Sequence, residues 1–148
     1  MARFLQPSII GRGPSLDVVC KIVDVIRYPT TGNLLEGEAR AYAALQSLQG
    51  DVIPKFYGFY EMWGILKLIA LQPVGDAISE DGDIIWELRV KMRAALRQIH
   101  NAGYVHGDIA RRNFCCKGTK VFLVDLERCR LAQRQSEQAH EMNQLDFL

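Results

Sequence analysis

Apolar residues recur along the first half of the chain with two different periods, which predict strands around one helix. Residues 18–23 form a mostly β-branched apolar run whose single charged member is Lys21, as expected of a buried strand. Across residues 34–50 the apolar positions are spaced by threes and fours, which predicts a helix. Residues 55–60 and 65–71 then predict two strands joined by a short turn.

The second half of the chain has a helical period followed by a hairpin pattern. Residues 72–75, Gln-Pro-Val-Gly, interrupt the strands. Asp83 is then expected to cap a long helix that Gly103 closes. Its predicted apolar face consists of Leu88, Met92, Ala95, Leu96 and Ile99. Residues 113–125 predict a hairpin that turns at 117–120.

This order of elements, strands first and helices later, predicts an α+β fold with two lobes. A chain of 148 residues is about one domain long. We therefore expect one domain, residues 1–148, with an N-terminal lobe at 1–71, a hinge at 72–75 and a C-terminal lobe at 76–148.

Composition excludes several classes of function. The formal charge is +1, from 18 basic and 17 acidic side chains, so we expect no nucleic-acid partner. The longest apolar stretch, 65–71, contains Lys67 and is too short to span a bilayer, and the first residues lack the apolar core of a signal peptide. We expect no membrane partner and a cytoplasmic or nuclear location.

Two charged residues lie on faces that their neighbours predict to be buried. Lys21 shares a strand face with Val19 and Val23, and Glu38 lies four residues from Leu34 on the predicted helix stripe. Burying an isolated charge costs several kcal/mol, so the simplest arrangement is an ion pair between Lys21 and Glu38. The alternative, a lysine that extends to solvent and a glutamate at the helix edge, stays equally open on position alone.

The predicted hairpin suggests a metal site. A turn centred on Gly118 pairs Asn113 almost directly with Asp125, and Asp108 lies five residues before Asn113. An amide oxygen and a carboxylate are ligands that suit Mg²⁺, which takes one or two protein ligands plus phosphate oxygens. Taken singly, each of these residues is more often a turn or capping residue.

In their order along the chain, four segments together resemble the motifs of protein kinases. Residues 106–113, His-Gly-Asp-Ile-Ala-Arg-Arg-Asn, resemble the catalytic loop. Residues 121–127 resemble the strand that leads into the Asp-Phe-Gly motif, with Leu and Glu in place of Phe and Gly. Residues 19–21 resemble the strand that carries the kinase lysine, and residues 38–42 resemble the helix that carries its glutamate partner. With its His-Gly-Asp loop, this set of segments most resembles small fungal protein-kinase-like proteins and other atypical kinases.

The resemblance implies a phosphotransferase that uses ATP and Mg²⁺. Lys21 would hold the α- and β-phosphates, and Glu38 would orient Lys21. Asp108 would accept the proton of the acceptor hydroxyl, while Asn113 and Asp125 would bind the metal. Lys21, Asp108 and Asn113 would thus be the catalytic residues.

The resemblance also implies how the rest of the nucleotide binds. Gln72 and Val74, in the hinge, would offer backbone groups to adenine, whereas Pro73 has no N–H to donate. His106 would support the catalytic loop. The acceptor would carry a hydroxyl group on a protein or on a small molecule.

Two departures from the kinase pattern favour an alternative. The candidate glycine-rich segment, residues 10–15, lacks the third glycine and leaves little room for a hairpin before Lys21. The short distance between this segment and Lys21 predicts a shortened sheet in the first lobe. Few residues follow Glu127, which predicts a truncated helical second lobe. The alternative is a pseudokinase-type binding module with weak or no nucleotide turnover.

Overall fold

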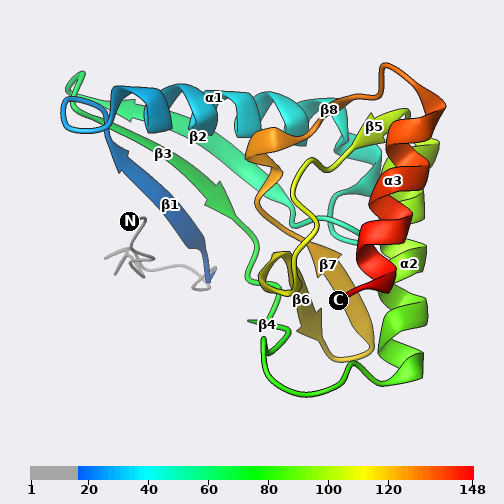
Figure 1. Ribbon diagram of the computed structural model, residues 1–148. Coiled ribbons are helices and arrows are strands. Elements are labelled where there is room, and N and C mark those ends of the chain that lie inside the picture. Colours follow the sequence, from blue (N-terminus) through cyan, green and yellow to red (C-terminus); the bar gives the residue numbers. More distant parts are fainter. Residues whose placement is uncertain (1–16) are drawn as a thin grey trace.

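The structure is a computed structural model that describes residues 17–148 (Figure 1). The candidate glycine-rich segment, 10–15, lies outside the described residues. A three-stranded sheet and one long helix make up the first part of the chain. Two further helices and a β-hairpin make up the rest.

The first sheet is antiparallel, with β3 (Leu66–Leu71) between β1 (Val19–Asp24) and β2 (Phe56–Met62). Its register places Lys21 opposite Ile69 of β3, a residue with no exposed surface. The strands predicted from the sequence are thus present within one or two residues of their expected ends. Lys21 thus lies on β1, at one edge of this three-stranded sheet, beside the buried β3.

Helix α1 (Pro29–Ala44) runs along the sheet, and it begins earlier than predicted (Figure 1). The expected start near residue 34 is wrong because Pro29 occupies the first turn, where a missing N–H costs nothing. Gly32 is buried in this helix, and a Cβ there would lie 2.8 Å from Val25 Cγ1. The helix also ends before the predicted Gly50, at Ala44.

The second part of the chain contains α2 and α3, which pack side by side, and the β6–β7 hairpin, which lies against α2 (Figure 1). The elements are β4 (Asp76–Ala77), α2 (Trp86–Asn101), β5 (Tyr104–Val105), β6 (Phe114–Lys117), β7 (Lys120–Leu123), β8 (Arg130–Leu131) and α3 (Gln135–Asp146). Strands β4, β6 and β7 form a second sheet, and β5 pairs with β8.

Helix α2 confirms most of the predicted apolar face but not the predicted cap. Met92, Ala95, Leu96 and Ile99 are buried, whereas Leu88 is only partly buried. The helix begins at Trp86, and the residue before it, Ile85, provides no side-chain cap. The expectation that Asp83 caps this helix is therefore wrong.

The β6–β7 hairpin has the predicted register. Phe114 lies opposite Leu123, and Lys117 lies opposite Lys120. One step further, the Val124 N–H donates to the Asn113 carbonyl over 2.9 Å. The two ends of the hairpin are thus held together, as the position of the turn predicted.

One apolar core joins the two parts of the chain. It contains Leu35 and Tyr42 of α1, Ile69 of β3, Met92 of α2 and Phe114 of β6, all almost or fully inaccessible to solvent. A short 3-10 turn, Leu126–Arg128, packs against α1 and adds Leu126 to this core. The sheet and the hairpin therefore cannot separate without exposing shared apolar surface.

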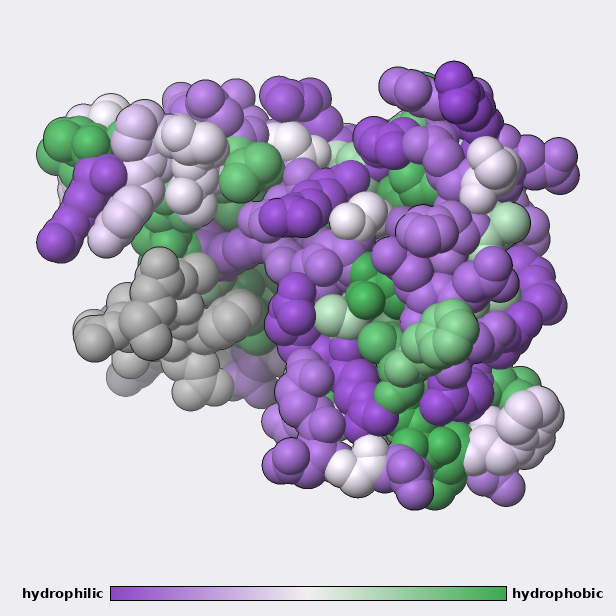
Figure 2. All heavy atoms as spheres, in the orientation of Figure 1, coloured by the Kyte–Doolittle hydropathy of each residue, from purple (hydrophilic) through white to green (hydrophobic). Residues whose placement is uncertain are grey.

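The surface is mostly polar on the face that Figure 2 shows. Hydrophobic residues are visible at its left-hand end, where the turn before α1 and the β2–β3 turn lie, and again in the middle and toward the lower right. Ile26, Trp63 and Ile65 are exposed in these two turns. Within residues 17–148, no helix combines the length and apolar content needed to cross a membrane.

We predict that Gly75 is essential to the link between the two parts. Its φ is +85°, and an added Cβ would lie 1.9 Å from the Cys116 carbonyl oxygen. Gly75→Ala should destabilise the fold by about 3 kcal/mol, from left-handed strain plus overpacking. Gly118→Ala is the matched control, because Gly118 also has positive φ but open space around it. Urea unfolding of both variants tests this, and equal losses would contradict it.

Candidate active site

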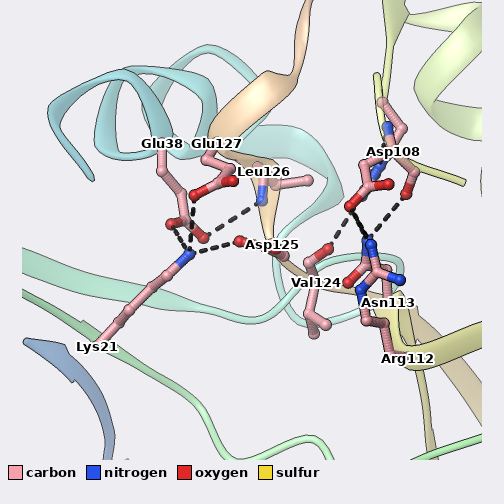
Figure 3. Close-up of polar contacts among 10 residues, drawn as sticks. Lys21, Glu38, Asp108, Arg112, Asn113, Val124, Asp125, Leu126 and Glu127 are labelled. Carbon is pink, nitrogen blue, oxygen red and sulfur yellow. Dashed lines mark hydrogen bonds and ion pairs between the residues drawn. The ribbon is translucent and has the colours of Figure 1, made fainter. Parts of the chain in front are cut away.

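The Lys21 ammonium lies among three carboxylates (Figure 3). Lys21 Nζ is 2.8 Å from Glu38 Oε2 and 2.5 Å from Asp125 Oδ1. Glu127 Oε2 is 3.7 Å away. The predicted contact between Lys21 and Glu38 is thus confirmed, and Asp125 joins the same cluster from the end of the hairpin.

Burial and charge set the proton affinities of this pair. Glu38 is 1% exposed, and its second oxygen, Oε1, accepts the Leu126 N–H over 3.3 Å. Burial raises the pKa of Glu38, an effect that the Lys21 ammonium and the Leu126 N–H partly offset. Burial also disfavours the Lys21 charge, but Glu38 and Asp125 outweigh it and raise the Lys21 pKa above its ordinary value. Lys21 therefore stays charged.

The backbone at Asp125 explains how this residue reaches Lys21. Asp125 has φ 64° and ψ 61°, the left-handed conformation that aspartate tolerates better than most residues. Leu126 then enters the core, while the carboxylates of Asp125 and Glu127 both point toward Lys21 (Figure 3). The leucine that replaces the expected phenylalanine is fully buried.

The predicted catalytic loop brings Asp108 and Asn113 into contact. Asn113 Nδ2 donates to the backbone carbonyl of Asp108 over 2.9 Å and to its Oδ2 over 3.0 Å (Figure 3). Arg112 Nη2 donates to the same Oδ2 over 2.8 Å. With its amide nitrogen engaged in this way, Asn113 keeps its amide oxygen as an acceptor.

His106 links the catalytic loop to the end of β7. Its Nδ1 accepts the Asp108 N–H over 3.3 Å, so Nε2 carries the proton and donates to the Val124 carbonyl over 3.0 Å. The ring has no exposed surface, and burial lowers the His106 pKa. His106 therefore contacts the loop and the hairpin but no candidate substrate site.

Glu141 of α3 holds the other side of the loop. It accepts the N–H of Gly107 at Oε1 over 2.6 Å, and the N–H of His106 at Oε2 over 3.0 Å. Oε2 also lies 2.8 Å from His100 Nε2. Burial alone would raise the pKa of Glu141, but the hydrogen bonds from His100 and the loop amides lower it. Glu141 was not predicted as a site residue, because it lies 34 residues after Gly107 and no sequence motif links the two.

Gly107 is required by the shape of this loop. Its φ is +86°, and a Cβ there would lie 2.5 Å from the Arg128 carbonyl oxygen. The close approach lets the loop and the turn after Asp125 lie against each other. A larger residue would separate them.

A cavity of about 620 Å³ lies between the first sheet and the second, large enough for a nucleotide. Its lining comes from β1, α1, the hinge and the hairpin, and includes Lys21, Glu38, Gln72, Val74, Asn113, Cys115 and Asp125. All predicted site residues except Asp108 thus line one cavity, and Asp108 contacts its rim through Asn113 and Arg112. Cys115 and Arg112 were not predicted to line it.

The hinge offers fewer backbone groups than the sequence suggested. The Gln72 N–H donates to the Lys55 carbonyl over 2.9 Å, and the Pro73 carbonyl accepts Lys117 Nζ over 2.9 Å. The Gln72 carbonyl and the Val74 N–H have no hydrogen-bond partner among residues 17–148. These two groups are the ones left to pair with a base.

Asn113 and Asp125 fit a magnesium ion in their chemistry. Both line the cavity, and they offer an amide oxygen and a carboxylate. Hard divalent cations prefer such oxygen ligands and take their remaining ligands from phosphate and water. Lys21, which holds Asp125 Oδ1, adds a positive charge for phosphate at the same place.

Comparison with known protein sequences gives a match to a kinase family and a match to a meiotic driver. The sequence model of the lipopolysaccharide kinase (Kdo/WaaP) family matches residues 87–148, less than half of the chain. The chain is 29% identical over 106 residues to the meiotic driver SPOK2 of Podospora anserina, which covers 66% of this chain and 14% of SPOK2.

Two solved kinases share the arrangement of elements. The PK-1 kinase of Cydia pomonella granulovirus superposes with a TM-score of 0.58 at 20% identity, covering 82% of this chain and 48% of PK-1. Vaccinia related kinase 3 superposes with a TM-score of 0.53 at 18% identity, covering 76% of this chain and 40% of that kinase. This chain has the protein-kinase-like fold. The expected α+β, kinase-like fold class is thereby confirmed, and the chain spans less than half the length of either kinase.

The family match covers one part of the candidate site. It spans residues 87–148, which include Asp108, Asn113 and Asp125 but not Lys21 or Glu38. Lys21 and Glu38 are placed at the site by the ion pair between them and by the cavity that they line.

We predict that Glu141→Gln loosens the kinase-like catalytic loop. The amide would replace one carboxylate oxygen with an NH₂ donor, which would face either a loop N–H or His100 Nε2, so the loss should be about 3 kcal/mol. Hydrogen exchange at the amides of 106 and 107 should also accelerate. Glu87→Gln, an exposed position on α2, is the control and should change neither quantity. Unchanged exchange in Glu141→Gln would contradict this role.

We predict a pH dependence of stability from His106. The pKa of His106 in the folded chain lies below the ordinary value of about 6.5. The contribution of the neutral His106 ring to the free energy of unfolding is therefore fully present above that pH. As the pH falls below about 6.5 the unfolded chain binds a proton that the folded chain resists, and stability falls until the folded pKa is passed. The difference in unfolding free energy between wild type and His106→Gln should therefore shrink from pH 7.5 to pH 5. A constant difference would show that His106 does not titrate in this way.

Proposed function

We propose that this chain is an ATP- and Mg²⁺-dependent phosphotransferase that moves the γ-phosphoryl group of ATP to a hydroxyl group. The observation that carries the proposal is the Lys21–Glu38 ion pair, which lines one cavity together with Asn113 and Asp125. Phosphoryl transfer needs mainly positioning and charge stabilisation, and these are what such side chains provide.

Each residue has a role that its contacts support. Lys21, held by Glu38, would pair with the α- and β-phosphates, and the adenine would meet the Gln72 carbonyl and the Val74 N–H. Asn113 and Asp125 would hold Mg²⁺, which neutralises charge on the phosphates when bound. The burial of Glu38 keeps Lys21 in one position, so little reorganisation is needed when phosphate arrives.

Asp108 would act as the base for the acceptor hydroxyl. Asn113 and Arg112 both donate to its Oδ2, which orients the carboxylate and leaves Oδ1 for the incoming proton. A general base must lie within hydrogen-bond reach of that proton. The acceptor is proposed to be a hydroxyl on a protein or a small molecule, because the described residues include no feature that selects one of them.

A pseudokinase-type binding module is the second candidate, and one observation favours it. Lys21 contacts Asp125 directly at 2.5 Å, so the same carboxylate is claimed by the lysine and by the proposed metal. A chain that kept this contact would bind nucleotide weakly. The two candidates differ in whether Mg²⁺ and ATP together displace Lys21 from Asp125.

The test compares Asp125→Ala with Asp108→Ala. Asp125→Ala removes a proposed metal ligand and should weaken Mg-ATP binding, measured as a smaller thermal shift at millimolar nucleotide. Asp108→Ala removes the proposed base, so binding should survive while turnover falls by about 10²- to 10⁴-fold. Phosphate transfer or ATP hydrolysis is measured beside binding for both variants.

Three outcomes separate the candidates. If wild type gives no thermal shift with Mg-ATP, the enzyme proposal fails. If wild type binds but shows no turnover, and both variants bind like wild type, the pseudokinase alternative holds. If Asp108→Ala loses binding as severely as Asp125→Ala, the division of roles between these two carboxylates is wrong.

A further inference from the structure

The residue two positions after Asp125 is Glu127, and it carries a charge that the proposed reaction does not use. Its carboxylate lies 3.7 Å from Lys21 Nζ and 25% of its side chain is exposed. The Glu127 side chain makes no other ion pair or hydrogen bond within residues 17–148. A partly exposed carboxylate with one long contact is free to move closer to its partner.

Lys21 needs such a partner if Asp125 binds metal. Glu38 already pairs with Lys21 through Oε2, and its Oε1 accepts the Leu126 N–H, so a second carboxylate for Lys21 must come from another residue. Asp125 supplies the second short contact, at 2.5 Å. A divalent cation that takes Asp125 repels the nearby ammonium and leaves Lys21, which is only 14% exposed, with one carboxylate.

The position of Glu127 suits it to replace Asp125 as a partner of Lys21. It follows the left-handed Asp125 and approaches Lys21 on the side of Glu38 (Figure 3). It does not line the cavity, whereas Lys21, Glu38 and Asp125 do. Glu127 can therefore pair with the ammonium without facing the phosphates.

We propose that Glu127 is a positioning residue that holds Lys21 in place when Asp125 turns to a divalent cation. Lys21 then exchanges the Asp125 carboxylate for that of Glu127 instead of losing a partner. The free energy needed to separate Asp125 from Lys21 is therefore smaller. This inference deepens the proposed function and rests on it only for the identity of the ligand. The exchange of Lys21 between two carboxylates can be tested without nucleotide.

The first experiment is a double-mutant cycle in the absence of nucleotide and metal. Asp125→Asn imitates the loss of the Asp125 charge to a cation. Glu127→Gln should change the unfolding equilibrium little in wild type but by about 5- to 10-fold in the Asp125→Asn background, because only there is Glu127 the remaining second partner. Labelling of Lys21 by an amine-reactive reagent, followed by mass spectrometry, should rise in the double variant alone. Additive effects in both measurements would overturn the proposal.

The second experiment is a Mg²⁺ titration of ATP binding by wild type, Glu127→Gln and Glu36→Gln. Glu127→Gln should raise the half-saturating Mg²⁺ concentration about 3- to 10-fold, because Lys21 then competes harder for Asp125. Glu36→Gln is the matched control: Glu36 lies on α1 and pairs with Lys67, away from Lys21, and its variant should titrate like wild type. An unchanged titration in Glu127→Gln would overturn the proposal.

The two experiments separate this inference from the proposed function. Coupling in the cycle, together with no Mg²⁺-dependent binding in wild type, would remove the proposed phosphotransferase and still support the exchange of Lys21 between Asp125 and Glu127. Additivity in the cycle, together with normal Mg²⁺-dependent binding in wild type, would remove Glu127 from the site and leave the proposed function standing.

Discussion

The charged and mostly buried Lys21 is the point at which the first sheet, the first helix and the segment after the hairpin meet. Lys21 lies on a strand whose neighbours are apolar, and the chain satisfies it with carboxylates from α1 and from the segment after β7. Leaving the buried Glu38 without Lys21 would leave an uncompensated charge in the core, at a cost of about 3–5 kcal/mol. The cluster thus joins the first sheet, the first helix and the segment after the hairpin, in addition to the apolar core that they share.

The catalytic loop is held from two sides by buried polar groups. His106 connects it to the end of β7 through Val124, and Glu141 connects it to α3 and to His100. Gly107 permits the close approach of the loop to the Arg128 carbonyl. Loops are usually the mobile parts of a fold, but here the loop that carries Asp108 and Asn113 is fixed by the hydrogen bonds of the buried His106 and Glu141. Such fixed geometry is what a site that works by positioning requires.

Asp125 contacts Lys21 and also lines the cavity, and the two residues after it have different roles. Leu126 fixes the segment in the core, and Glu127 points back to Lys21. Because the Lys21 ammonium and a divalent cation would compete for the Asp125 carboxylate, the charge balance here would govern the proposed binding of nucleotide with metal. The departures of this chain from the kinase pattern, Leu126 and Glu127, therefore lie where that balance is set.

The sequence by itself determined the local parts of the structure, because periodicity and turn position act over a few residues. It predicted the apolar face of α2, the register that brings Asn113 beside Val124, and the contact between Lys21 and Glu38 that buried charge demands. Tertiary structure decided the rest. Helix α1 starts at Pro29 and not near residue 34, the Gln72 N–H pairs with Lys55, and Glu141 contacts the predicted catalytic loop from 34 residues away. Those contacts join segments distant along the chain, and only packing of the complete fold brings them within reach of each other.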